Sequence, residues 1–355
     1  MGNLTDTQCN FSYKIHLYLF SVTYILLLLI GVPANLYSLY HALLQMRVRN
    51  ELGIYLLNLT ASDLLYLASL PLWLQYFFQN DNWTHKEWLC KVSGFLLYQN
   101  IYISIGFLCC ISIDRFLAIV FPLRSTCFRS MPAASVVSAI IWLKELGVGV
   151  IFFFQKELSK DPTNHTLCFE HYPMQDWERG INYYRFLVGF LLPLATLCIS
   201  YPWVLRVVNK STGTQSSQKI RIKHLVTGTV VIFLVCFSPY HIFLMLRTLL
   251  EKNCDFVTSI FNYYHFSLLL TSLNCLADPL LYCFVGETTR RNMQLLRRKC
   301  ALLLCCKREV GHAASSEPPT VKDNTASGVT LLQSKLLSAD FCHRIHLEGK
   351  GSNTK

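Results

Sequence analysis

The sequence predicts an all-α membrane protein: a seven-transmembrane helix bundle followed by an amphipathic helix on the inner membrane face. The first observation is composition, because 52% of the 355 residues are hydrophobic and only 15% are charged, whereas a soluble domain carries about 25% charged residues. The second is segment length, because seven apolar runs can each cross a hydrocarbon core of about 30 Å. These runs lie at about 17–44, 53–79, 90–120, 133–154, 181–208, 224–250 and 256–285.

This pattern divides the chain into four regions. We expect an extracellular N-terminus at 1–16, the bundle at 17–285, a juxtamembrane helix at 286–306 and a disordered cytoplasmic tail at 307–355. The first apolar run is long enough to be a signal anchor rather than a cleavable signal peptide. The stretch after the seventh run is basic and amphipathic, which is typical of a helix lying on a membrane. Its cysteines Cys300, Cys305 and Cys306 are candidates for palmitoylation, with free thiols as the alternative.

Lysine and arginine residues predict the orientation. They gather in the first, third and fifth connections and at the start of the tail, so these belong on the cytoplasmic side. The net charge of +11 therefore needs no nucleic-acid partner. The N-terminus then lies outside a multi-pass plasma-membrane protein, where the sequons at Asn3 and Asn10 are candidate glycosylation sites.

The third apolar run connects two landmarks. Arg115 follows Cys90 by 25 residues, and a helix of that length covers roughly 37 Å. Cys90 therefore lies at the outer water interface and the pair Asp114-Arg115 at the inner one. Lys91, beside the cysteine, is the one charge between them.

Four cysteines are expected on the outer side. Cys90 and Cys168 lie at the start of the third run and in the second outer loop, and an oxidising compartment allows them to pair. Cys9 and Cys254 are the other two, and their bond would tie the N-terminus to the start of the seventh helix. Two free thiols are the alternative for Cys9 and Cys254.

Three carboxylates lie deep in apolar runs, namely Asp63, Glu145 and Asp278. An acid at a helix centre costs about 2.5–3.5 kcal/mol on insertion, which makes such residues functional candidates. Burial and mutual repulsion both favour the neutral, protonated form. Two alternatives stay open: a polar network that only holds the helices together, and a sodium ion shared by Asp63 and Asp278.

Histidines gather at the expected outer ends of the segments. Their unperturbed pKa of about 6.5 places the charge change in the physiological range. These histidines are His16, His85, His165, His171 and His265, with His241 deeper in the bundle. Ordinary packing is the alternative for each one alone. Arg185, Arg247 and Lys156 are expected to add positive charge nearby. A metal site is the other alternative, and it is disfavoured because no two of these histidines have i, i+4 spacing on one helix.

These landmarks together resemble the rhodopsin-like G-protein-coupled receptors over about 17–300. The landmarks are Asn35 in GVPAN, Asp63 in NLTASDLLY, Cys90, Asp114-Arg115, Trp142, Cys168, Pro193, Phe237-Ser238-Pro239-Tyr240 and Asp278-Pro279-Leu280-Leu281-Tyr282. The resemblance implies a Cys90–Cys168 disulfide. It also implies that Asp114, Arg115 and Tyr282 take part in coupling to heterotrimeric G proteins.

Longer strings are similar to the proton-sensing subgroup of that family, among them NIYISIGFLCCISIDR, CFEHYP, NYYRFLVGF and HFSLLLTSLNCLADPLLYCFV. The resemblance implies activation by extracellular acid, with coupling to Gq/11 and, among members, to Gs and G12/13. It implies that arrestin and receptor kinases bind the tail. It assigns sensing roles to His16, His85, His171 and His265, a supporting role to His241, and a buried acidic triad to Asp63, Glu145 and Asp278.

The chain departs from the family at a few positions. Phe116 stands where the family has tyrosine, and Asp278 replaces the asparagine of the wider family while fitting the subgroup. Tyr13 and Gln99 occupy places where the subgroup has histidine and glutamate. The pH midpoint is therefore expected to differ.

Other functions remain as alternatives. The main one is a receptor for a peptide or a lysolipid, which would respond to ligand at fixed pH. An amine receptor is disfavoured because this chain has no carboxylate in the outer part of the third span. An opsin is disfavoured because the seventh span has no lysine. No nucleophile–base pattern predicts an enzyme, and no repeat predicts a transporter or channel. No cofactor is expected beyond the proton as ligand and a sodium ion near Asp63.

Overall fold

The computed structural model describes residues 14–122, 125, 128–160, 164–169, 174–211, 215–251 and 254–285, with the backbone alone for 14–16 and 283–285. The chain divides into two compact units, Met1–Thr289 and Arg290–Lys355. All described residues belong to the first unit, so the predicted juxtamembrane helix and tail lie outside them.

The seven predicted spans are confirmed as helices. The first is α1 (Lys14–Leu26), η1 (Leu27–Gly31) and α2 (Val32–Arg47), and the second to fourth are α3 (Leu52–Phe78), α4 (Glu87–Val120) and α5 (Met131–Phe154). The fifth is α6 (Asp176–Phe186), η2 (Leu187–Leu191) and α7 (Leu192–Lys210), and the sixth is α8 (Ser216–Ile232), η3 (Phe233–Phe237) and α9 (Ser238–Leu250). The seventh consists of α10 (Cys254–Ser272) and α11 (Asn274–Val285). Within the described ranges, six helices are long and apolar enough to cross a membrane, and the seventh segment is interrupted at Leu273.

Three of these spans contain a wide π turn directly before a proline. The turns η1, η2 and η3 precede Pro33, Pro193 and Pro239, each at the second position of the next helix. Proline has no N–H and its ring clashes with the carbonyl four residues earlier, so an ordinary α turn cannot continue there. Widening that turn to the i→i+5 pattern keeps the helix continuous.

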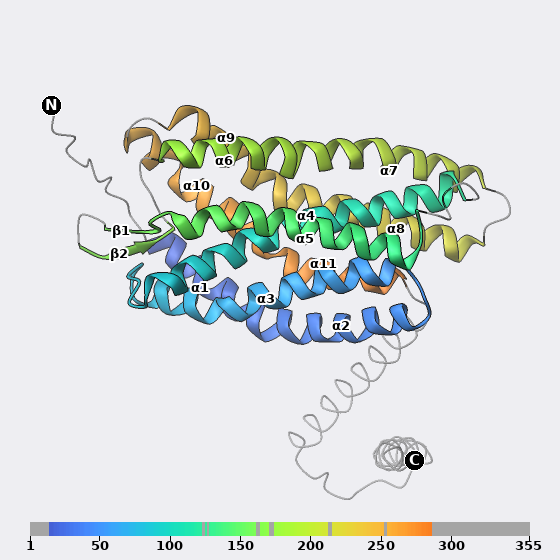
Figure 1. Ribbon diagram of the computed structural model, residues 1–355, viewed down its shortest axis with the longest axis horizontal. Coiled ribbons are helices and arrows are strands. Elements are labelled where there is room, and N and C mark those ends of the chain that lie inside the picture. The colour runs from blue at the N-terminus through green and yellow to red at the C-terminus, as the bar shows by residue number, and fades with distance from the viewer. Residues whose placement is uncertain are drawn as a thin grey trace, which may run out of the picture. The chain divides into compact units, whose positions relative to one another are not determined.

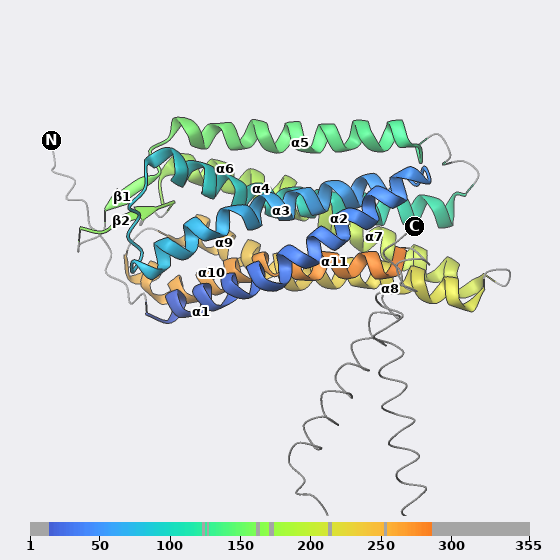
Figure 2. The ribbon, with the colours of Figure 1, turned by 90° about the horizontal axis from the view of Figure 1, so that it is seen from below.

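The helices run side by side along the bundle (Figure 1). Strands β1 (Leu158–Lys160) and β2 (Thr166–Cys168) form an antiparallel hairpin at the end where α6, α9 and α10 also lie, as both Figure 1 and Figure 2 show. We call this the hairpin end. We call the opposite end, where α4 ends at Val120 shortly after Arg115, the Arg115 end.

The lateral surface of the bundle is apolar. Leu143 on α5 and both Leu192 and Ile199 on α7 are each more than 60% exposed, as expected where lipid replaces water. In Figure 2, α5 lies along one edge of the bundle, where it contacts α3 and α4. This edge position determines which side chains Glu145 on α5 can reach.

Candidate functional site

The hairpin is fastened to α4 by a disulfide. The predicted Cys90–Cys168 bond is confirmed, with 5.8 Å between the two Cα atoms. Phe169 follows directly, with a φ of 61°, and its ring lies where a side chain at Gly94 would be, since a Cβ there would come within 2.3 Å. Glycine is therefore required at position 94. The loop is held against α4 by one covalent bond and one inserted ring.

A pocket with a cavity volume of about 90 Å³ opens inside the hairpin end. Its walls contain several aromatic residues, including Phe20, Phe77 and Phe152. The titratable or charged residues that line it come from five helices and the loop: Tyr24, Tyr98, Glu157, Glu178, Arg185, Arg247, Tyr264 and His265. An apolar pocket with a few convergent polar groups is the usual form of a ligand site.

Arg185 is the most unusual group in this pocket. It is 5% exposed, and its guanidinium carbon lies 3.9 Å from the Tyr98 ring centroid and 4.8 Å from that of Phe152. Its Nε has no hydrogen-bond partner among the described residues. The aromatic faces attract the cation, but in this part of the chain no carboxylate neutralises it.

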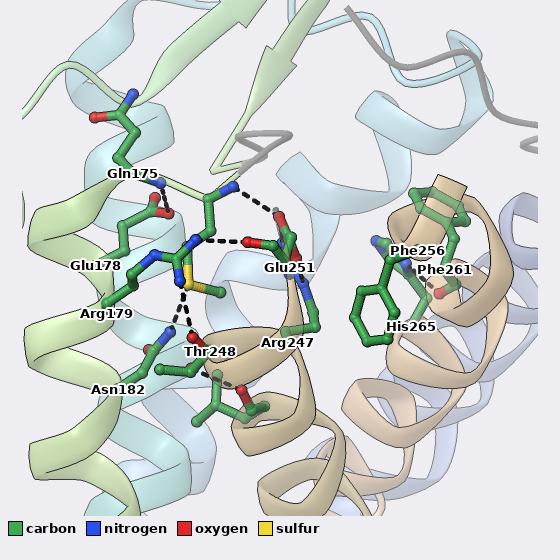
Figure 3. A network of polar contacts seen from close by, with 12 residues as sticks. Gln175, Glu178, Arg179, Asn182, Arg247, Thr248, Glu251, Phe256, Phe261 and His265 are labelled. Carbon is green, nitrogen blue, oxygen red and sulfur yellow. Dashed lines mark hydrogen bonds and ion pairs between the residues drawn. The ribbon is translucent and has the colours of Figure 1, made fainter. Parts of the chain in front are cut away.

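Glu251 at the end of α9 is the opposite case. Its side chain is fully buried. Arg247 binds it through Nε at 2.6 Å and through a terminal nitrogen at 3.1 Å, and the Met174 backbone N–H donates to it at 2.7 Å. Arg179 on α6 donates to the Thr248 and Glu251 carbonyls at 3.1 Å and 2.5 Å. Figure 3 shows these groups converging, with His265 on the neighbouring helix.

This Glu251 network, comprising Met174, Arg179, Arg247, Thr248 and Glu251, joins three elements. Helix α9 ends there, and the last carbonyls of any helix lack partners within the helix. Arg179 supplies donors to two of them, and its positive charge also suits the negative end of the helix dipole. The loop after the hairpin, α6 and α9 are thereby fastened together.

His265 lines the pocket from α10 and is 6% exposed. Its Nδ1 lies 2.9 Å from the Phe261 carbonyl oxygen, so the nitrogen is the donor. Its ring packs 4.1 Å from the Phe261 ring, 5.5 Å from Tyr264 and 6.4 Å from Phe20, centroid to centroid. An added proton would therefore go to Nε2.

The other predicted histidines are placed differently. His85 lies at the hairpin end, 2.9 Å from the Gln75 side-chain oxygen and beside Trp83. His241 is fully buried below the pocket, where its Nδ1 donates to the Phe237 carbonyl at 2.8 Å and its ring stacks on Phe190. His16 lies in the first turn of α1 with its side chain outside the described part, and His171 lies outside it altogether.

A second polar region lies in the core. Asp63 on α3 accepts a hydrogen bond from Asn100 at 2.8 Å and contacts the Cys275 sulfur at 3.4 Å. Asp63 also acts electrostatically on Asp278 of α11. The second oxygen of Asp63 and both oxygens of Asp278 lack a hydrogen-bond partner among the described residues. Two carboxylates and an amide give the oxygen donors that a hard cation prefers, so the residues present fit either protons or a sodium ion.

Glu145 is buried as expected but belongs to a different environment. Its side chain lies 2.6 Å from the Lys144 ammonium, and Gln99 donates to its backbone carbonyl at 2.6 Å. Because α5 lies at the edge of the bundle, Glu145 faces α4 rather than α11. Asp63 and Asp278 are thus near enough to interact electrostatically, whereas the third predicted carboxylate lies beside a lysine.

The Arg115 end carries a third polar cluster. Asp114 accepts hydrogen bonds from Arg115 Nε at 2.9 Å and from Arg129 Nε at 3.1 Å. Arg129 also binds Glu51 at 2.6 Å, which links the start of α3 to the loop before α5. Nearby, the Tyr282 hydroxyl donates to the Leu56 carbonyl at 2.5 Å. The side chains of Asp114 and Arg115 are therefore in contact, and Arg129 and Glu51 are two further members of this cluster.

Comparison with known proteins adds to this geometry. Residues 34–282 match the 7 transmembrane receptor (rhodopsin family). That match covers most of the chain and all three polar regions. The chain belongs to the rhodopsin family of seven-transmembrane receptors. It is therefore a G-protein-coupled receptor rather than an enzyme.

Individual relatives place this receptor more narrowly. It is 54% identical to G-protein coupled receptor 68 of Bos taurus, over 90% of this chain and 89% of the relative. It is 39% identical to G-protein coupled receptor 65 of Homo sapiens, over 80% and 87%, and 35% identical to lysophosphatidic acid receptor 6 of Gallus gallus, over 80% and 94%. The subgroup expected from the motifs is confirmed by the first of these.

Some receptor residues were not found from the sequence. Glu251, four residues after Arg247, has the helical i, i+4 spacing of an ion pair, and that signal was overlooked. Glu51 and Arg129 carry no such signal, because they lie 78 positions apart. Cys254 is disulfide-bonded, but Cys9 lies outside the described residues, as do Asn3, Asn10, Cys300, Cys305 and Cys306, so these predictions remain predictions.

Proposed function

We propose that this receptor is activated by extracellular protons, with the N-terminus and the hairpin end outside the cell. The observation that carries the proposal is the Asp63–Asp278 pair, because two buried carboxylates with few donors are unfavourable when both are ionised. Acid would neutralise this pair. It would also charge the histidines at the hairpin end, of which His265 lines the pocket.

The sign of the effect follows from linkage. Acid favours the active state only if these groups bind protons more tightly in that state than in the inactive one. One pKa unit of difference is worth about 1.36 kcal/mol. Four such groups would supply about 5.4 kcal/mol, close to what moves an equilibrium from 1:99 to 99:1. No single group is sufficient, so single substitutions should give graded losses.

Coupling would pass through Arg115. In this proposal the output is a heterotrimeric G protein, Gq/11 first and Gs or G12/13 in addition, with arrestin and receptor kinases acting on the tail. A sodium ion at Asp63 and Asp278 would occupy the same oxygens as the proton, so the two cations would compete. The Cys9–Cys254 bond, glycosylation at Asn3 and Asn10, and acylation of the juxtamembrane cysteines belong to the same proposal.

The test is second-messenger output in cells titrated from about pH 8 to about pH 6, a range that brackets histidine titration. D63N/D278N is compared with a His16/His85/His171/His265→Phe variant at equal cell-surface level. A loss of pH response in D63N/D278N supports the role of the core pair. An unchanged response in that variant would rule the pair out, and an unchanged response in the quadruple variant would rule the histidines out.

A second candidate function rests on Arg185. A buried guanidinium without a carboxylate, on an aromatic wall, suits the phosphate of a lysolipid, and one relative is a lysophosphatidic acid receptor. This function requires a response to lysophosphatidic acid at a constant pH of about 7.8, where histidines are neutral. The response should be lost in Arg185→Met. Its absence in the wild-type receptor would exclude this candidate.

A further inference from the structure

We propose that Glu251 is a positioning residue of the outer proton site, which neutralises Arg247 and thereby sets the pH at which the receptor responds. The inference rests on the proposed function, because it concerns where the pH response is centred. Glu251 is neither a histidine nor a member of the core acid pair, and it is not among the residues that line the pocket. Its effect would pass through Arg247, which does line the pocket.

Arg247 and His265 are close enough to interact electrostatically. The Arg247 guanidinium carbon lies 4.4 Å from the Tyr264 ring centroid, and the His265 ring centroid lies 5.5 Å from the same point. The two groups are therefore at most about 10 Å apart, on one wall of a common pocket. At that distance two unit charges in a protein interact appreciably.

Other charged groups face the same space. Glu178 and Arg185 on α6 line it, and so does Glu157, the residue directly before β1. The tyrosines Tyr24, Tyr98 and Tyr264 complete the titratable set. These groups stay unchanged when Glu251 or Arg247 is substituted, so the difference between variants isolates the contribution of the pair.

The predicted direction follows from Coulomb's law. With Glu251 present, the Arg247 cation is matched by a carboxylate in two hydrogen bonds, so this pair contributes little net charge to the surroundings of His265. Without that carboxylate, the protonated His265 faces a guanidinium that has lost the charge of Glu251. Two such charges about 10 Å apart repel by the equivalent of roughly 0.3 pH unit in water and about 1.2 units at an effective dielectric constant of 20.

Glu251 also fixes the chain segment that enters α6. Its carboxylate accepts the Met174 N–H, and Met174 follows His171 by three residues in the sequence. The same residue thus serves two functions. It compensates the charge of Arg247, and it holds the end of the loop that carries another predicted sensing histidine.

The experiment is a pH titration of second-messenger output in four receptors at matched cell-surface level: wild type, E251Q, R247M and R247M/E251Q. We expect E251Q to need more acid. The repulsion at His265 corresponds to roughly 0.3 to 1.2 pH units, and half-activation should shift by at most that amount because several groups share the response. R247M leaves an unmatched carboxylate that attracts the histidine proton, so its shift should be towards neutral pH. In R247M/E251Q both charges are absent, and the midpoint should return most of the way to wild type.

Opposite shifts in the two single variants separate electrostatics from structural damage, which would move both in one direction. E251D retains the charge and should restore the wild-type midpoint. D176N removes an exposed carboxylate of the same region and should shift nothing. Equal midpoints in all variants, or shifts of the same sign in E251Q and R247M, would overturn the inference. A wild-type receptor that ignores pH would instead refute the proposed function.

Discussion

Glu251 at the hairpin end and the pair Asp63–Asp278 in the core are all buried carboxylates, yet their surroundings are opposite. Glu251 receives three hydrogen bonds, two of them from a guanidinium. Three of the four core carboxylate oxygens receive none from the described residues. Burial alone therefore does not make an acid a proton sensor. The number and charge of the donors decide whether the ionised form is retained.

The largest effect that would sharpen this comparison is expected from R247M. The substitution leaves a fully buried carboxylate without its cation, and breaking a buried pair in this way costs about 3 kcal/mol or more. We expect a clear fall in the melting temperature of the detergent-solubilised receptor. Removing both charges in R247M/E251Q should recover part of that loss. A melting temperature equal to wild type in R247M would mean that Glu251 does not need the ion pair.

D278N tests the other side of the comparison. An amide removes the repulsion with Asp63, so the variant should gain about 1–2 kcal/mol of unfolding free energy at neutral pH. A folded protein that binds protons more tightly than its unfolded chain gains stability as the pH falls. The wild type should therefore approach the variant in acid. Melting temperatures measured across pH would contradict this if D278N were less stable than wild type throughout.

The Lys144–Glu145 pair provides an intermediate case. Lys144 is 38% exposed on the lipid side of α5, so E145Q would leave its ammonium in hydrocarbon without a partner. Insertion of an unpaired charge costs about 2.5–3.5 kcal/mol, although the long lysine stem can move its head group towards water and reduce this. Cell-surface amounts should fall in E145Q and recover in K144M/E145Q. Equal surface amounts in both would show that the pair is not needed for insertion.

The smallest effect is expected at the Arg115 end. Glu51 and Arg129 are partly exposed, at 14% and 24% of their side chains, so their bond contributes about 0.5–1 kcal/mol. E51Q would weaken the hold of Arg129 on Asp114 and raise basal G-protein signalling roughly two- to fivefold. E87Q, which removes a carboxylate from an exposed ion pair at the hairpin end, is the matched control. A basal signal no higher than that of E87Q would exclude a restraining role.

The position of a residue along its helix could be predicted from the sequence, whereas the side chains that it meets on neighbouring helices could not. Counting residues from Cys90 placed both ends of α4, and the Cys90–Cys168 bond followed from the family resemblance. The burial of Asp63, Glu145 and Asp278 also agrees with their position in apolar runs. Which carboxylate meets which partner depends on helix rotation and packing order. Glu145 therefore lies beside Lys144 although the motifs grouped it with the two aspartates.

Charge partners that lie close in the sequence can be predicted from their spacing, even though the pair Arg247–Glu251 was missed. Arg247 and Glu251 are one helical turn apart, and their pairing was within reach of simple periodicity. Glu51 and Arg129 come from separate connections, and only the fold brings them together. The same holds for Arg185, whose aromatic contacts arise from α4 and α5.

The π turns before the prolines have a further consequence for how each span is aligned. A π turn accommodates one residue more than an α turn, and one residue corresponds to about 100° of rotation around the helix axis. The half of the sixth span beyond η3 is therefore out of phase with the half before it. His241 and Arg247 are buried on the inner face of α9, and this face is rotated relative to the inner face that α8 would present without the π turn. Deleting one residue of η3 would turn this half as a unit, so the hairpin-end face of the span can change without altering the face at the Arg115 end.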